Sequence, residues 1–295
     1  MTESTSFVIR APAKINLSLE ITGRRPDGYH NLVTIFQTID LSDELSFQPA
    51  DSLELDCDES TLANEDNLVL RAARILQVVA GTHLGARIGL KKAIPIAAGL
   101  GGGSADAAAT LLGLKRLWNL SIEHRDMAAI AGQLGADVPF LLRGGTAVAG
   151  GIGDEIEWLP DPSPRYVVLL TPKIPAINKT ATAFRAIRAT DFSDGAISRA
   201  LADSFRNRLT DRDPWALIET GRNTFDRAAE ELYPTVGTAR SAMLATGAPW
   251  VRLSGAGPTL FTVFDTLDAA RLFASNLEEL ATVRVASTRP GNASV

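Results

Sequence analysis

The stretch that decides the fold runs from Pro95 to Ala109 and reads PIAAGLGGGSADAAA. Four of the 24 glycines of the chain fall within Gly99–Gly103, directly before a segment with helical periodicity. Glycine lets backbone N–H groups converge on an anion, and the N-terminus of a helix adds partial positive charge. A phosphate is therefore the natural occupant of this loop, and a glycine-rich turn that serves only close packing is the alternative.

Before this loop, the sequence predicts strands and one helix. Period-two alternation of apolar residues covers most of the first sixty positions. A helix is predicted after Asn67, with Gly81 as its stop. A short strand, Ala86–Leu90, then leads into the loop. The strands expected before the helix lie at 7–12, 15–21, 32–41, 45–47 and 53–55.

After the loop, the pattern predicts two helices. Ser104 is expected to be the N-cap of the first, with Asp106 in its first turn and Trp118 near its end. Ser121 is expected to cap the second helix, and Gly135 to end it.

The clearest domain boundary is PDPSP at 160–164, which has three prolines in five residues. It divides the chain into 1–162 and 163–295. Strands and helices are mixed without regular alternation, which favours the α+β class. Beyond the boundary we expect several helices, a strand at 167–170, a strand–turn–strand at 250–264, a helix at 267–280 and a strand at 283–286. Gly144–Gly145 and Gly150–Gly153 are predicted to be hairpin turns.

Length and composition exclude several classes of protein. The chain has 295 residues, of which 45% are hydrophobic and 21% charged, so intrinsic disorder and a small disulfide scaffold are excluded. The net charge of −5 argues against a nucleic-acid-coating role. One cysteine, Cys57, cannot form an intramolecular disulfide. No apolar stretch approaches the ~18 residues of a membrane span, and we expect a cytoplasmic protein that binds neither membrane nor nucleic acid.

The common nucleotide-binding loops do not match. A Walker loop needs a lysine before its Ser or Thr, and none follows here. Ser104 stands where a dinucleotide fingerprint needs its third glycine. The tripeptide at 124–126, His-Arg-Asp, lies inside a helical pattern, and Ala131 occupies the place of the kinase asparagine.

Three blocks in order resemble the motifs of the GHMP kinase superfamily. APAKINL at Ala11–Leu17 resembles the first motif, PIAAGLGGGSADAAA the second, and LSGAGPTLF at Leu253–Phe261 the third. The resemblance implies a two-lobed α+β fold. Its N-terminal lobe is a ribosomal-protein-like α/β domain that binds ATP, and its C-terminal lobe is a ferredoxin-like α+β domain.

Two further blocks narrow the resemblance. GRRPDGYHNL at Gly23–Leu32 and LGADVPF at Leu134–Phe140 resemble the 4-diphosphocytidyl-2-C-methyl-D-erythritol kinase family. This implies transfer of phosphate from ATP, with Mg²⁺, to the 2-hydroxyl of a cytidine diphosphate-linked methylerythritol in non-mevalonate isoprenoid biosynthesis. A monomer or weak homodimer is expected.

The resemblance also implies roles for single residues. Asp137 would be the general base that accepts the proton of the substrate hydroxyl, although an arbitrary loop aspartate is usually a capping group. Lys14 would keep that carboxylate ionised and stabilise developing negative charge, although a lone strand lysine often only faces solvent. Ser104 would add a hydroxyl toward phosphate or magnesium, and the protein ligands of the metal are left open. The nucleotide-binding residues would be Pro95, Ile96, Ala97, Ala98, Gly99, Leu100, Gly101, Gly102, Gly103, Ser104 and Ala105.

The substrate side follows from the same resemblance. Tyr29 would stack on cytosine and His30 would form hydrogen bonds with the base, and base–aromatic stacking contributes roughly 1–3 kcal/mol. Phe184 is the candidate for the second aromatic, with core packing of a helix as the alternative. Asn16, two residues from Lys14 on a strand, is expected on the same side and would bind the methylerythritol part. Gly255, in a loop that could be only a tight hairpin, would close the phosphate pocket.

Two alternatives stay open at this stage. Another GHMP kinase, acting on homoserine, mevalonate or a sugar, is disfavoured by Tyr29-His30 and by GADVPF. A nucleotide-binding regulator without catalytic activity is disfavoured by the presence of Lys14 and Asp137.

Overall fold

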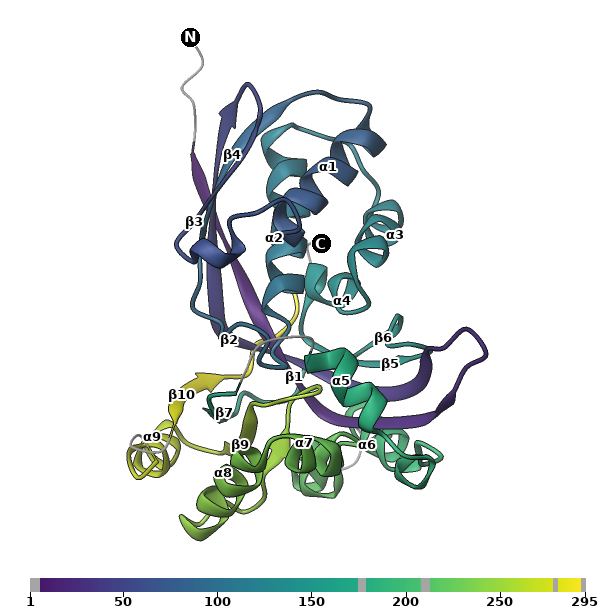
Figure 1. The fold of residues 1–295 in the computed structure, drawn as a ribbon, viewed down its shortest axis with the longest axis vertical. Coiled ribbons are helices and arrows are strands. Elements are labelled where there is room, and N and C mark those ends of the chain that lie inside the picture. The colour runs from purple at the N-terminus through teal and green to yellow at the C-terminus, as the bar shows by residue number, and fades with distance from the viewer. Residues whose placement is uncertain (1–5, 175–178, 208–212, 278–280, 293–295) are drawn as a thin grey trace.

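Two sheets form the framework of the molecule (Figure 1). The computed structural model describes residues 6–174, 179–207, 213–277 and 281–292. In the first sheet the strand order is β3-β4-β2-β5-β6, and β1 pairs with β2. Its strands are β1 (Phe7–Arg24), β2 (His30–Ala50), β3 (Leu53–Cys57), β4 (Gly85–Lys91), β5 (Thr146–Gly150) and β6 (Glu155–Leu159).

The long hairpin of β1 and β2 passes through both parts of the molecule (Figure 1). The two strands have 18 and 21 residues, whereas the sequence predicts four shorter ones. The register of β1 shifts between Pro12 and Lys14 and again between Asn16 and Ser18. These bulges interrupt the alternation of apolar residues without ending the strand, which is why the sequence pattern divides it.

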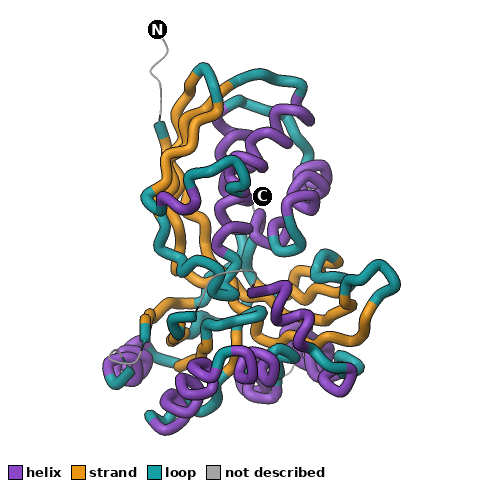
Figure 2. Tube along the Cα trace, viewed as in Figure 1, coloured by secondary structure: helices purple, strands orange, loops and turns teal. Residues whose placement is uncertain are grey.

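Helices cover one face of the first sheet (Figure 2). As predicted, Asn67 caps α1 by accepting a hydrogen bond from the backbone N–H of Val69, and Gly81 ends it in the left-handed conformation. The predicted strand at 86–90 is also confirmed as β4. The helical segments of this half are η1 (Ser60–Leu62), α1 (Leu68–Ala80), α2 (Gly102–Leu117), α3 (His124–Leu134) and α4 (Val138–Arg143).

Helix α2 begins three residues earlier than predicted. Its N-cap is Gly101, with φ of 73°, so Ser104 is not the cap and lies inside the first turn. Asp106 therefore falls beyond that turn, and its side chain is buried. The predicted cap is wrong because Gly101 supplies a left-handed residue at no steric cost, which allows the helix to start within the glycine run.

Two other predicted ends also differ. Ser121 is not a cap, because α3 starts at His124 with Glu123 at its N-cap. Gly135 does end α3, as expected. Gly144–Gly145 is not a hairpin turn; it links the end of α4 to β5. Gly150–Gly153 does form the turn between β5 and β6.

The second sheet has the order β10-β7-β9-β8, and the helices between residues 226 and 275 lie on its side away from the first half (Figures 1 and 2). The predicted strands at 167–170 and 283–286 and the strand–turn–strand at 250–264 are confirmed. The helix expected at 267–280 ends at Ser275, and residues 278–280 lie outside the described ranges. The strands are β7 (Tyr166–Thr171), β8 (Arg252–Leu253), β9 (Leu260–Phe264) and β10 (Thr282–Ser287); the helices are α5 (Lys179–Ala186), η2 (Ala189–Asp191), α6 (Ala196–Arg206), η3 (Pro214–Thr220), α7 (Asp226–Leu232), α8 (Pro234–Ala245) and α9 (Leu267–Ser275).

The two halves share buried contacts. One core cluster includes Ile15 of β1 together with Leu169 and Phe261 of the second sheet. The buried guanidinium of Arg252 donates to three backbone carbonyls, those of Leu17 on β1 and of Ile218 and Glu219 on η3. Residues on both sides of the proline-rich segment at 160–164 therefore share one hydrophobic core. The domain boundary at this segment stays a prediction.

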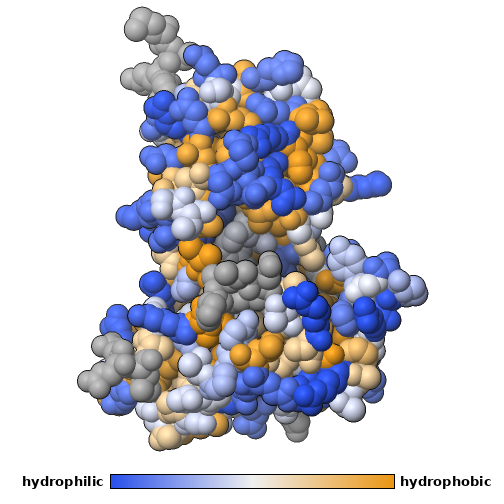
Figure 3. Space-filling model, in the orientation of Figure 1, coloured by the Kyte–Doolittle hydropathy of each residue, from blue (hydrophilic) through white to orange (hydrophobic). Residues whose placement is uncertain are grey.

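The outer surface is mainly polar over both halves, with scattered apolar patches, on the face shown in Figure 3. Within the described ranges, no helix combines the length and the apolar character that crossing a bilayer requires.

Candidate functional site

Lys14 and Asp137 meet in a cavity of about 410 Å³ between the two halves of the chain. Lys14 lies on β1 at the first register shift, where its backbone N–H turns away from β2 and donates to Leu100 O at 2.9 Å. The bulge therefore fixes this strand residue to the glycine loop. The distance from Lys14 Nζ to Asp137 Oδ2 is 3.4 Å.

The ammonium of Lys14 has three acceptors. It donates to Asn16 Oδ1 at 2.7 Å and to Gly99 O at 3.2 Å, besides its ion pair with Asp137. Asn16 and Lys14 do lie on the same side of the strand, as their spacing predicts. Because the lysine is only 4% exposed, it is not a solvent-facing strand residue. A buried ammonium with these acceptors presents positive charge at one fixed place.

Asp137 lies directly before α4, after the short connection of Gly135 and Ala136 that follows α3. Although it occupies the N-cap position, its side chain forms no capping hydrogen bond. The carboxylate is about one-third exposed and lines the cavity. It is therefore available to a group that enters the cavity, which a capping role would not allow.

The glycine loop is held from the C-terminal half. The hydroxyl of Ser254 donates to Gly99 O at 2.9 Å, and the backbone N–H of Thr259 donates to Ala98 O at 3.3 Å. A Cβ on Gly99, which has φ of 81°, would lie 2.1 Å from Ser254 O. Only glycine fits this close approach.

The loop around Gly255 lines the same cavity, as expected, and Asn223 fixes it. The Asn223 amide donates to Leu253 O and to Gly255 O, both at 2.8 Å, and its Oδ1 accepts from the backbone N–H of Phe225 at 2.9 Å. Asn223 is 3% exposed and lies outside every motif that the sequence analysis singles out.

The predicted nucleotide-binding residues divide between two cavities and the core. Leu100 and Ala105 are each 1% exposed and pack into the core, so their side chains line neither cavity. Ser104 faces the first cavity, and within the described ranges its hydroxyl has no hydrogen-bond partner. A second cavity of about 370 Å³ opens on the other side of the loop, and Gly102, Gly103 and Ala97 line both.

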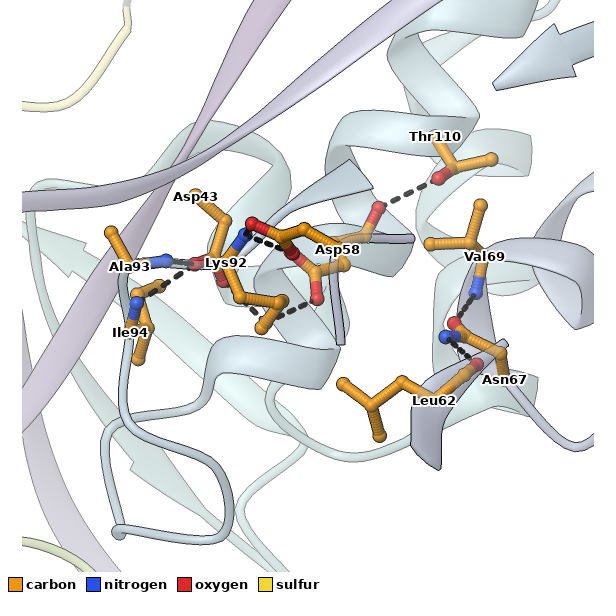
Figure 4. A network of polar contacts seen from close by, with 10 residues as sticks. Asp43, Asp58, Leu62, Asn67, Val69, Lys92, Ala93, Ile94 and Thr110 are labelled. Atoms are coloured by element: carbon orange, nitrogen blue, oxygen red, sulfur yellow. Dashed lines mark hydrogen bonds and ion pairs between the residues drawn. The ribbon is translucent and has the colours of Figure 1, made fainter. Parts of the chain in front are cut away.

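A polar network forms the wall of this second cavity (Figure 4). Lys92 Nζ bridges the carboxylates of Asp43 and Asp106. Asp43 is fully buried, and its Oδ1 accepts the backbone N–H groups of Ala93 at 2.6 Å and Ile94 at 2.8 Å. These bonds hold the segment that enters the glycine loop. Across the cavity, Asn67 caps α1 and donates to a loop carbonyl (Figure 4).

The carboxylate of Asp106 accepts fewer hydrogen bonds than that of Asp43, the other buried carboxylate of this network. Burial raises its pKa to about 7, with a further contribution from Asp43 and an opposing one from Lys92. Its Oδ2 accepts from Lys92 at 2.6 Å, and its Oδ1 is buried without a partner among the described residues. The prediction placed Asp106 in the first turn of the helix and did not include this buried environment.

An aromatic cavity of about 570 Å³ adjoins the first one. Tyr29, His30 and Phe184 line it, so three residues assigned to the substrate side lie together. The His30 ring stacks on Phe184 with 5.2 Å between centroids, and Tyr29 is 61% exposed. Phe184 and Ile152 line both this cavity and the one at Lys14.

The ring contacts limit where a flat base can enter. A base between two parallel rings separates their planes by about 7 Å, twice the contact distance of carbon atoms. His30 and Phe184 leave no such gap. Tyr29 has no ring contact with another described aromatic residue, so its face is open. Burial, with a contribution from the charge of Arg24, lowers the pKa of His30, and the imidazole is neutral at pH 7.

Sequence reasoning missed several residues of the site. Ile152 belongs to a turn that the sequence predicts only as a turn, yet it joins two cavities. Thr34 lies in strand β2 and Lys92 follows strand β4, and neither belongs to a sequence motif. Nothing in their spacing along the sequence indicates a functional role. Their roles depend on partners 14 or more residues away, which a local pattern does not contain.

The described residues contain no group of three or more His, Cys, Asp or Glu side chains that could enclose a metal ion. Mg²⁺ in nucleotide sites usually keeps several waters and is held by phosphates with one or two protein ligands. The cavity with Ser104 and Asp137 offers oxygen donors of that kind.

Comparison with known proteins places the chain in a family. The model described as "GHMP kinases N terminal domain" matches residues 67–145, and "GHMP kinases C terminal" matches 208–281. A relative from Prosthecochloris aestuarii, named 4-diphosphocytidyl-2-C-methyl-D-erythritol kinase, is 40% identical over 92% of this chain and 94% of its own. A relative of the same name from Dehalococcoides mccartyi is 38% identical over the same shares.

The chain belongs to the 4-diphosphocytidyl-2-C-methyl-D-erythritol kinase family. The resemblance seen in the sequence motifs is thereby confirmed. This kinase shares its fold with a solved 4-(cytidine 5'-diphospho)-2C-methyl-D-erythritol kinase, at a TM-score of 0.79 and 33% identity over 97% of this chain and all of that one. A homoserine kinase from Cytophaga hutchinsonii, 18% identical with a TM-score of 0.75 over 99% of this chain and 96% of that one, shows the same fold. The α+β, two-lobed GHMP kinase fold is thus confirmed, and the kinase is an ATP-dependent small-molecule kinase.

Proposed function

We propose that this kinase transfers the γ-phosphoryl group of ATP to the 2-hydroxyl of 4-diphosphocytidyl-2-C-methyl-D-erythritol, in isoprenoid precursor biosynthesis. One observation carries the proposal. The Lys14–Asp137 pair lies in a cavity that shares lining residues with the aromatic cavity on one side and with the cavity beyond the glycine loop on the other. A phosphoryl donor and a cytidine-linked acceptor can therefore meet at this pair.

The chemistry follows from the groups at the pair. Asp137 accepts the proton of the substrate hydroxyl as its oxygen attacks the γ-phosphorus, and the bond to the β-phosphate oxygen breaks to release ADP. Lys14 stabilises the negative charge on the oxygens in transfer. Phosphoryl transfer depends mainly on positioning and charge, which a fixed ammonium and backbone N–H groups provide.

The nucleotide would span the glycine loop. Its phosphates bind at Gly99–Ser104 and the N-terminus of α2, and its nucleoside occupies the cavity between Asn67 and Lys92. This places the adenosine away from the aromatic cavity. Pro95 and Ile96 line the nucleoside side, and Gly255 closes the phosphate side.

The cytidine end of the substrate would occupy the aromatic cavity. Cytosine stacks on the open face of Tyr29, and neutral His30 offers one donor and one acceptor to the edge of the base. Phe184 forms the opposite wall, already packed against His30. The methylerythritol part extends past Ile152 toward Asn16 and the Lys14–Asp137 pair.

Magnesium would arrive with the nucleotide. Ser104 would hold it through its hydroxyl, which has no other partner in the described part of the chain and faces the phosphate cavity. When bound, the ion neutralises phosphate charge. We further propose that the enzyme works in the cytoplasm as a monomer or weak homodimer, without nucleic acid or membrane.

The decisive experiment measures ADP release from ATP and Mg²⁺ with a panel of alcohols. We expect phosphorylation of the cytidine diphosphate-linked methylerythritol and no turnover of homoserine, mevalonate or galactose. The proposal fails if the cytidine substrate is ignored while another alcohol is phosphorylated, or if no alcohol is phosphorylated although ATP binds.

A further inference from the structure

A chain of buried hydrogen bonds runs from the catalytic cavity into the first sheet. Lys14 Nζ donates to Asn16 Oδ1 at 2.7 Å, and Asn16 Nδ2 donates to Thr34 Oγ1 at 2.8 Å. The hydroxyl of Thr34 donates to Ser18 O at 2.7 Å. Lys14, Asn16 and Thr34 are 4%, 2% and 1% exposed, so bulk water cannot replace any of these bonds freely.

The direction of each bond depends on the next one. The single proton of the Thr34 hydroxyl is used on the carbonyl of Ser18, so its oxygen is left as an acceptor. The NH₂ end of the Asn16 amide must face that acceptor, and its carbonyl end then faces the ammonium of Lys14. If the amide rotated by half a turn, its NH₂ group would face an NH₃⁺ group, and neither can accept a hydrogen bond.

The orientation of this amide decides where the lysine ammonium lies. Of the three acceptors of Lys14 Nζ, Asn16 Oδ1 is the nearest at 2.7 Å, followed by Gly99 O at 3.2 Å and Asp137 Oδ2 at 3.4 Å. A lysine side chain has many rotamers, and an acceptor at its tip removes most of them. Asp137 is partly exposed and lies farthest from Lys14 Nζ of the three acceptors.

We propose that Thr34 is a positioning residue for phosphoryl transfer: its hydroxyl orients the amide of Asn16, and this amide holds the ammonium of Lys14 beside Asp137. The inference rests on the proposed function, in which Lys14 assists the transfer. Thr34 itself needs no contact with the reacting atoms. It belongs to none of the sequence motifs, and within its side chain only the hydroxyl takes part in the hydrogen-bond chain.

The first test replaces the hydroxyl by a methyl group of the same shape. In Thr34→Val we expect kcat to fall roughly 10- to 100-fold, because a displaced ammonium is costly in the transition state. The KM values for ATP and for the acceptor alcohol should change less than about twofold, since an interaction made only in the transition state lowers kcat and kcat/KM equally. Thr34→Ser keeps the hydroxyl and should retain most of the wild-type kcat.

The matched control is Thr262→Val on β9. Thr262 is equally buried, and its hydroxyl has no partner among the described residues, so its loss should leave kcat unchanged. Thermal unfolding of each variant separates a loss of folded protein from a loss of rate. If Thr34→Val is too unstable to assay, Thr34→Cys replaces it, because a thiol is a much weaker donor and acceptor of similar size.

A double-mutant cycle gives the sharpest test. If Thr34 acts through Asn16, then Thr34→Val should cause no further loss of kcat in an Asn16→Ala enzyme. The proposal would be overturned if the kcat loss of the double variant equalled the product of the two single losses. It would also be overturned if Thr34→Ser were as slow as Thr34→Val. The cycle is measured with whichever alcohol the wild-type enzyme phosphorylates, so a wrong acceptor assignment and a wrong role for Thr34 give different results.

Discussion

At the scale of single residues, the site combines one buried cation with one accessible carboxylate. Lys14 is almost fully buried and held by three acceptors, whereas Asp137 is about one-third exposed. This difference matches the proposed roles, because a charge stabiliser benefits from a fixed position and a base must reach the proton of an incoming hydroxyl.

Replacement of Asp137 by Asn should remove the base and keep the shape. We expect kcat to fall by roughly 10² to 10⁴, which is the usual contribution of general base catalysis. ATP binding measured by calorimetry should change little, since the phosphates bind at the glycine loop. Asp126→Asn, on the exposed side of α3, is the control. An Asp137→Asn enzyme with the wild-type kcat would remove Asp137 as the base.

Replacement of Tyr29 by Ala should weaken binding of the cytidine substrate alone. Loss of one stacking surface of roughly 1–3 kcal/mol predicts a KM for the cytidine alcohol about 5- to 160-fold higher. The KM for ATP should stay the same, because the nucleoside of ATP is assigned to the other side of the glycine loop. Tyr29→Phe keeps the ring and should behave like the wild type. Equal effects on both KM values would mean that Tyr29 is only structural.

At the scale of elements, the glycine loop and α2 are shaped by what packs against them. Gly101 caps the helix in a left-handed conformation, and Gly99 allows the backbone of the third motif to approach. The sequence predicts the loop and the helix correctly because their signals are local. It places the cap on Ser104 wrongly, because a glycine cap has no side-chain signal and Ser104 is an equally good local candidate.

Alanine substitution should have opposite effects on stability at Gly99 and at Gly132, because the space around the two residues differs. Gly99→Ala would place a Cβ 2.1 Å from Ser254 O at a positive φ, so it should lower the melting temperature and disrupt the contact between the two halves. Gly132→Ala, inside α3 with no atom within 4 Å of the added Cβ, should raise stability by about 0.5–1 kcal/mol. Differential scanning calorimetry compares the two. A Gly99→Ala protein as stable as the wild type would contradict the close approach.

At the scale of the whole molecule, the site is assembled from segments far apart in the chain. The motifs at 11–17, 95–109 and 253–261 identify the kinase family. Partners such as Thr34, Asn223 and Lys92 are found only once the chain is folded, because most of their hydrogen bonds join positions 14 to 49 residues apart. The family motifs therefore predict the chemistry of the site, and the tertiary structure supplies the residues that position it.

The buried carboxyl of Asp106 should make the stability of the whole protein depend on pH. Its pKa is about 7 when folded and near the ordinary 3.8 when unfolded, so the folded state retains a proton that the unfolded state loses between about pH 4 and 7. Its contribution to stability is complete below that window and is lost as the pH rises through it.

The test compares Asp106→Asn with the wild type by urea unfolding at several pH values. Lys92 and Asp43 are the same in both proteins. As the pH rises from 5 to 8, the unfolding free energy of Asp106→Asn should increase relative to that of the wild type. Asp126→Asn, an exposed position, should show no such trend. A pH-independent difference would mean that Asp106 is ionised throughout.

The contact between Ser254 and Gly99 also affects when the site can form during synthesis of the chain. The glycine loop leaves the ribosome long before the segment that contacts it, because Gly99 and Ser254 are 155 residues apart. At synthesis rates of about 5–20 residues per second, the loop waits roughly 8–30 seconds for its partner. A nascent chain that carries only the first half therefore has both residues of the Lys14–Asp137 pair but lacks the Ser254 hydroxyl that donates to Gly99 O. We expect phosphoryl transfer to start only when the C-terminal half has emerged and folded.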